Sequence, residues 1–118
     1  MIKLKEIKEI LKATVLCGED LMDQNITGGG AADLMEDVLA AAAEGAVLLT
    51  GLTTDHVLRA AKLAGVRAIV FVRGKQPDEQ FVELAASYSL PLLKTDDSLF
   101  VACGRLYMNG LRGLDGSW

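Results

Sequence analysis

Three polar turns of this sequence carry the residue types that bind an anion, and each turn follows an apolar stretch. They span residues 50–55, 73–75 and 95–98. Together they hold glycines, hydroxyl groups, predicted helix starts and two cations, Arg73 and Lys75. Backbone amides at a helix start and nearby cations are the groups that hold a phosphate. The pattern indicates an anion site, although helix capping alone also explains Gly, Thr and Asp at such turns.

A run of three glycines, Gly28 to Gly30, follows Thr27 and forms a fourth candidate segment. Consecutive glycines disfavour a helix and indicate a turn, a strand end or a close backbone approach. The run is not a P-loop, because the GxxxxGK[ST] spacing is missing. We expect this segment to join the other turns. The candidate ligand-binding residues are therefore Thr27, Gly28, Gly29, Thr50, Gly51, Thr53, Asp55, Arg73, Gly74 and Lys75.

No pattern in the chain indicates a self-sufficient catalytic centre. His56, the single histidine, would act as a general base only together with Asp55 and a nucleophile such as Thr53. A surface or capping histidine is the simpler interpretation. Asp96 and Asp97 could hold a metal, but paired aspartates at a helix start are usually caps. We predict no catalytic residue, no metal and no cofactor.

Composition limits the class of protein and its partners. The chain has 118 residues, of which 51% are hydrophobic, so we expect one domain, residues 1–118, with a buried core. A net charge of −4 disfavours nucleic acid as a partner. No apolar stretch reaches the roughly 20 residues of a membrane span. Cys17 and Cys103 are far apart and form no CxxC, which favours two reduced thiols and a cytoplasmic location.

Apolar segments alternate with helical patterns along the chain. We expect strands over residues 14–17, 46–50, 66–72 and 91–94. We expect helices over residues 2–12, 34–44, 54–64 and 97–109, and one more helix that begins at about residue 77. Asp33 and Glu36 are spaced as a capping box for the second helix, and Thr95 or Asp96 is expected to cap the last one. Strands that are apolar on both faces indicate a parallel sheet covered on both sides. The predicted fold is a single three-layer α/β domain, with a short, mostly parallel sheet flanked by helices.

The last segment of the chain is apolar and broken by glycines. Met108, Leu111, Leu114 and Trp118 lie among Gly110, Gly113 and Gly116, so a regular helix cannot continue there. A tryptophan near a terminus is a candidate interface anchor. We therefore expect self-association, with a homodimer as the simplest form.

Three stretches together resemble the DRTGG domain family: residues 47–53, residues 68–79 and residues 90–93. The chain is similar, more distantly, to the N-terminal domain of HPr kinase/phosphorylase. It has Asp55-His56 in place of an Asp-Arg pair, and its only literal Thr-Gly-Gly is at residues 27–29. The resemblance implies a regulatory domain of the kind found beside CBS domains, in long bacterial phosphotransacetylases or alone. It implies no kinase activity, which belongs to a P-loop domain.

Two functions follow from these observations. The first is a non-catalytic regulatory or ligand-sensing domain that binds a nucleotide or phosphorylated small molecule at the carboxyl ends of the strands. Arg73 and Lys75 would pair with the negative charge of the ligand, and the backbone amides around Gly51 and Thr53 would donate hydrogen bonds to it. The alternative is a protein-interaction module that acts through the segment from Met108 to Trp118.

Overall fold

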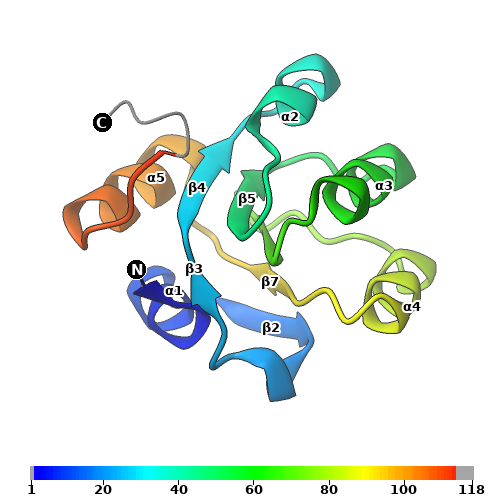
Figure 1. The fold of residues 1–118 in the computed structure, drawn as a ribbon, viewed down its shortest axis with the longest axis horizontal. Helices are drawn as coiled ribbons and strands as arrows, with labels where there is room; N and C mark the ends of the chain where they lie inside the picture. Colours follow the sequence, from blue (N-terminus) through cyan, green and yellow to red (C-terminus); the bar gives the residue numbers. More distant parts are fainter. Residues whose placement is uncertain (1, 114–118) are drawn as a thin grey trace.

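The computed structural model describes residues 2–113, and its main feature is a five-stranded sheet (Figure 1). The order across the sheet is β2-β7-β6-β5-β4. Strands β4 to β7 are parallel to one another, and only β2 runs antiparallel, beside β7. The predicted three-layer, mostly parallel fold is confirmed. The strands are β2 (Thr14–Cys17), β4 (Gly28–Ala31), β5 (Ala46–Thr50), β6 (Ala68–Phe71) and β7 (Leu92–Lys94).

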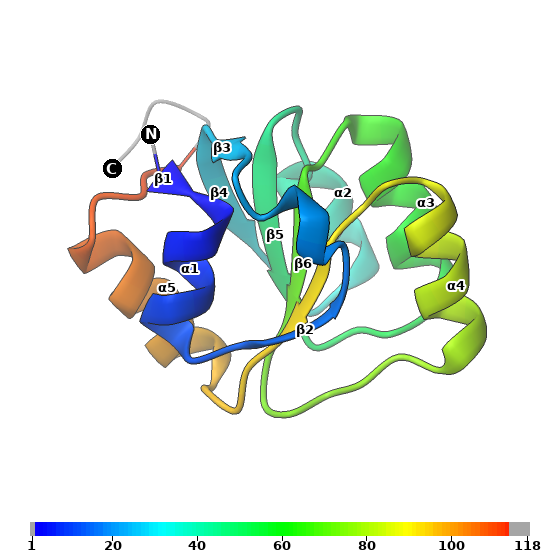
Figure 2. The same cartoon turned by 90° about the horizontal axis from the view of Figure 1, so that it is seen from below.

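Helices cover both faces of this sheet. Figure 2 shows α1 and α5 on one side and α3 and α4 on the other. Alternation along β5 explains the two cores, because successive side chains of a strand point to opposite faces. Val47 and Leu49 pack with α1 and α5, whereas Leu48 packs with α3 and α4. The helices are α1 (Leu4–Leu11), α2 (Met35–Ala41), α3 (Asp55–Ala64), α4 (Glu79–Ser87) and α5 (Leu99–Met108).

The first predicted helix begins two residues late. Ile2 and Lys3 form β1 (Ile2–Lys3), which pairs with β3 (Asn25–Ile26) in a small antiparallel sheet. That pairing holds the backbone extended, so α1 starts at Leu4. A short 3₁₀ helix, η1 (Glu19–Leu21), lies in the segment predicted as a polar connection.

Several predicted caps are wrong by a few residues. The predicted Asp33–Glu36 capping box is absent, because Leu34 precedes α2 and Asp33 makes other contacts. Helix α2 also ends at Ala41, before the predicted Glu44. Ser98, rather than Thr95 or Asp96, caps α5 by accepting a hydrogen bond from the Val101 amide at 3.2 Å.

The glycine run forms the edge strand β4, which the sequence patterns did not predict. Glycine has a low strand propensity, but here a side chain would collide with its neighbours. A Cβ at Gly30 would meet the backbone of Ala41, and one at Gly29 would meet Leu111 at 2.9 Å. Of the three predicted alternatives, a close backbone approach is therefore the one that the structure shows. Gly29 also bridges to Gly113 on its outer side.

Within residues 2–113, none of the helices combines the length and the apolar character that crossing a bilayer requires.

Candidate functional site

The carboxyl ends of four parallel strands bring four loops to one rim of the sheet, which we call the carboxyl rim. These loops follow β4, β5, β6 and β7. The antiparallel strand β2 begins at the same rim, because Thr14 pairs with Lys94. Ligands of open α/β sheets bind at this rim. The predicted turns at residues 50–55, 73–75 and 95–98 do converge there.

Asp33 links two of these loops. Its carboxylate accepts a hydrogen bond from the Gly51 amide at 2.6 Å through Oδ1. Its other oxygen, Oδ2, pairs with the Arg73 guanidinium at 3.0 Å. The donors come from the loops after β5 and β6, while Asp33 comes from the loop after β4. One carboxylate is thus held by an amide and a guanidinium, the pair of donors that a phosphate oxygen would use.

A tight turn after β6 presents Arg73. Its backbone is left-handed, with φ of 54° at Arg73 and 66° at Gly74. Two hydrogen bonds hold this turn to the loop after β7: the Arg73 amide donates to the Asp97 carbonyl at 2.8 Å, and the Gly74 amide to the Thr95 carbonyl at 2.9 Å. The turn backbone is therefore fixed, and the Arg73 side chain, about 43% exposed, lies at the surface.

In the loop after β5, two backbone amides already donate hydrogen bonds within the protein. The Leu52 amide donates to Thr50 Oγ1 at 3.1 Å, and Thr50 itself is fully buried. With the Gly51 amide already on Asp33, the donors left at this loop are those that begin α3. Thr53 is half-buried, and Asp55 is exposed in the first turn of α3. Thr50 therefore shapes the loop from inside the core.

Acidic and basic groups are mixed at the carboxyl rim. Asp97 pairs with Arg105 at 3.5 Å, and Asp96 lies beside Gly74. Lys75 is exposed, as is Lys12 at the end of α1. Among the residues that the structure describes, no group of three or more His, Cys, Asp or Glu side chains is placed to hold a metal ion.

The glycine segment does not join this site, contrary to our expectation. Thr27 precedes β4, and Gly28 pairs with Ala46, the first residue of β5. Both therefore lie at the opposite rim of the sheet. Gly29 is the next residue in β4, where its amide donates to the Arg112 carbonyl at 2.9 Å. Sequence reasoning placed this segment wrongly because it did not identify the segment as a parallel strand.

Asp33 is the residue of the site that the sequence analysis missed. Its position three residues before Glu36 indicated a helix cap. The signal that could have revealed its role is the strand before it, since a residue that follows a parallel strand reaches the carboxyl rim. Three glycines concealed that strand.

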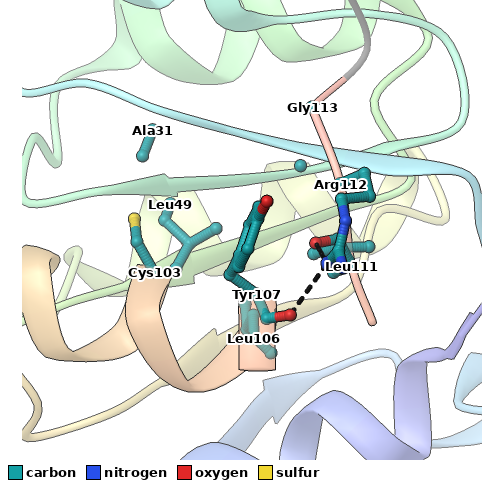
Figure 3. Close-up of a pocket in the computed structure, with 9 residues that line it drawn as sticks. Ala31, Leu49, Cys103, Leu106, Tyr107, Leu111, Arg112 and Gly113 are labelled. Carbon is teal, nitrogen blue, oxygen red and sulfur yellow. Dashed lines mark hydrogen bonds between the residues drawn. The ribbon is translucent and has the colours of Figure 1, made fainter. Parts of the chain in front are cut away.

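A cavity of about 130 Å³ lies between β4, α5 and residues 111–113 (Figure 3). Its lining is mainly apolar and includes Leu49, Leu106 and Leu111. Arg112 closes one side, with its guanidinium 4.0 Å from the centre of the Tyr107 ring and a 2.8 Å hydrogen bond to the Tyr107 carbonyl.

Cys103 also lines this cavity, and Cys17 lies on the other face of the sheet. Both are free thiols and half-buried. Burial raises the pKa of Cys103, and it likewise raises the pKa of Cys17 despite a hydrogen bond to the backbone. Neither cysteine therefore has the lowered pKa of a reactive nucleophile.

Comparison with known proteins agrees with this architecture. Helices on both faces of a mostly parallel sheet define a three-layer α/β protein. The chain belongs to the DRTGG domain family, whose pattern matches residues 6–107. No match was found among curated proteins.

One similar solved structure contains the CBS and DRTGG domains of the regulatory region of Clostridium perfringens pyrophosphatase, in complex with its activator diadenosine tetraphosphate. The TM-score is 0.69 at 17% identity, over 88% of this chain and 45% of that one. The present chain thus corresponds to less than half of that chain. At this identity the likeness establishes the shared fold. The similarity to HPr kinase/phosphorylase stays a prediction.

Proposed function

We propose that this chain is a non-catalytic regulatory domain that binds an anionic small molecule, such as a nucleotide or a phosphorylated metabolite, at the carboxyl rim. The observation that carries the proposal is the convergence of the Gly51 amide and the Arg73 guanidinium on one carboxylate. Two donors from different loops already hold an anion there. The phosphate of a ligand would take the place of the Asp33 carboxylate.

The energetics support such an exchange. The Asp33 and Arg73 side chains are about 36% and 43% exposed. An exposed ion pair contributes at most about 1 kcal/mol. A phosphate brings more charge and more acceptor oxygens than a carboxylate, and it can also use the amides at the start of α3. Lys75, in the same loop as Arg73, is exposed and supplies a second cation.

The regulatory role is supported by the family and by the structural relative. Membership of the DRTGG family places the chain among domains such as the one in the pyrophosphatase regulatory region. That region is in complex with a nucleotide activator. A cytoplasmic location is part of the proposal and rests on the sequence, in which Cys17 and Cys103 are far apart and form no CxxC.

A thermal-shift titration of the full chain tests the proposal. We expect ATP, diadenosine tetraphosphate or inorganic phosphate to raise the melting midpoint, because a ligand that binds only the folded state stabilises it. Arg73→Gln should abolish the shift. Arg59→Gln, which removes an exposed arginine of α3, is the matched control and should leave the shift unchanged.

Asp33→Asn tests whether the Asp33 carboxylate competes with the phosphate for Gly51 and Arg73 or only holds the loops together. Removing the internal anion should tighten phosphate binding about fivefold, the factor that corresponds to about 1 kcal/mol. Midpoints unmoved by all three anions, or a shift that survives Arg73→Gln, would contradict the proposal.

A second candidate is the protein-interaction module predicted from the last segment. Residues 114–118, including Leu114 and Trp118, lie outside the described residues. The observation that favours this function is the exposed apolar side chain of Met108 at the end of α5. Truncation after Gly113 tests it, because association through residues 114–118 should then be lost, while Leu111 stays in the core and Arg112 stays paired with Gly29.

A further inference from the structure

Helix α5 exposes apolar side chains on the face turned away from the sheet. Phe100 is 87% exposed and Met108 is 86% exposed, and Val101 and Tyr107 are exposed to a lesser degree. Because an α-helix has 3.6 residues per turn, residues three, four, seven and eight apart share one face. These four side chains and Gly104 therefore form one continuous surface, which we call the α5 stripe. Helices of globular proteins normally place polar residues on this face.

The α5 stripe is symmetric about Gly104. Phe100 and Met108 lie four residues before and after this glycine, and Val101 and Tyr107 lie three residues before and after it. Nothing lies within 4 Å of the position that a Gly104 Cβ would occupy, so the centre of the stripe is open. A glycine at the crossing point of two helices lets their backbones approach closely.

Charge does not prevent the stripe from meeting a copy of itself. Arg105 is the only Lys, Arg, Asp or Glu in α5, and its guanidinium pairs with Asp97 at the carboxyl rim. The α5 helix lies at the periphery of the molecule, beside α1 and on the side opposite α3 and α4 (Figures 1 and 2). Its outer face is thus accessible to another molecule.

We propose that the α5 stripe is the interface of a homodimer, in which two copies of α5 pack antiparallel and cross at Gly104. A two-fold axis demands a surface that is complementary to itself, so that residue i meets residue j and residue j meets residue i. The symmetry about Gly104 satisfies this demand. Phe100 of one copy then faces Met108 of the other, and Val101 faces Tyr107, so an aromatic ring meets a thioether and another aromatic ring meets an aliphatic side chain.

Sedimentation velocity on the full chain gives the first test. The wild-type chain should be a dimer at micromolar to tens of micromolar concentration. Phe100→Glu should convert it to a monomer, because each dimer would bury two carboxylates in an apolar interface. Leu63→Glu is the matched control, since Leu63 is an 88% exposed leucine on α3, and it should remain a dimer. Circular dichroism checks that both variants are folded.

Cross-linking tests the two-fold geometry, in a chain whose Cys17 and Cys103 are replaced by Ala. Gly104→Cys should form a disulfide-linked dimer on oxidation, and Leu63→Cys should not. Phe100→Cys protein should cross-link with Met108→Cys protein rather than with itself. A monomeric wild-type chain, a dimer that survives Phe100→Glu, or a Gly104→Cys chain that fails to cross-link would overturn the proposal. Anion binding at the carboxyl rim involves none of these residues, so either proposal can fail alone.

Discussion

Thr95 is the residue at which three parts of the carboxyl rim are joined. It is only 2% exposed, and its hydroxyl donates to the Leu11 carbonyl at 2.8 Å and accepts from the Asp97 amide at 3.3 Å. The Thr95 carbonyl accepts from the Gly74 amide. One residue thus connects the end of α1, the loop after β7 and the turn that carries Arg73.

Thr95→Val keeps the shape of the side chain and removes the hydroxyl. We expect it to lower the free energy of unfolding by about 1–3 kcal/mol, because the Leu11 carbonyl loses its buried donor. Urea denaturation measures the change. Thr54→Val removes the exposed hydroxyl of the N-cap residue of α3, which accepts no hydrogen bond from that helix, and it should stay within about 0.5 kcal/mol of wild type. Equal effects of the two substitutions would show that the Thr95 hydrogen bonds contribute nothing.

At the residue scale, the sequence predicted part of the candidate site. Gly51, Arg73, Gly74 and Lys75 lie at the carboxyl rim because each follows a strand that is apolar on both faces, and such strands are readable from sequence. Asp33 follows a strand of glycines, which carries no apolar signal. Its contacts to Gly51 and Arg73 join residues 18 and 40 positions away, so local patterns could not have shown them.

At the scale of elements, the end of α1 shows a residue in an unfavourable conformation. Lys12 has a φ of 50°, a left-handed value, and its amide donates to the Glu9 carbonyl. The left-handed conformation costs roughly 1–2 kcal/mol for a residue with a Cβ, and glycine adopts it freely. The helix stop is therefore set by the fold around it, not by the residue at this position.

Lys12→Gly should raise the free energy of unfolding by about 1 kcal/mol, since it removes the left-handed strain. Lys8→Gly, at an exposed position inside the same helix, should lower it by about 1 kcal/mol, the cost of glycine in a helix interior. Urea denaturation of the two variants compares the same chemical change with opposite expected signs. Destabilisation by both would mean that the Lys12 side chain contributes more than its backbone strain costs.

The elements themselves were largely predictable, and the exceptions have physical causes. Strands β5, β6 and β7 were expected because both faces of each strand are buried. The caps shifted where tertiary contacts outweighed local preference. Leu34, rather than Asp33, is the residue before α2, because the Asp33 carboxylate binds Gly51 and Arg73. Ile2 is not part of the first helix, because it pairs with Ile26 in a strand.

At the scale of the whole molecule, the two proposals concern separate surfaces of one sheet. The carboxyl rim gathers loops from every parallel strand, whereas the α5 stripe lies on the outer side of one helical layer. The layers were predictable from apolar periodicity. The outer face of α5 was not, because an apolar residue that packs inward and one that meets a partner give the same sequence pattern.

Mass action offers a final prediction that separates the two surfaces. If two copies pair through α5, the melting midpoint should rise with protein concentration, because association stabilises only the folded state. The midpoint of Phe100→Glu should be independent of concentration. Phosphate or a nucleotide should still raise the midpoint of this monomeric variant, since the Gly51 amide and Arg73 are unchanged. Differential scanning fluorimetry over a range of protein concentrations, with and without the anion, measures both effects. A wild-type melting midpoint that does not change with protein concentration would contradict the proposed dimer. A midpoint that none of the anions raises would contradict the proposed site at the carboxyl rim.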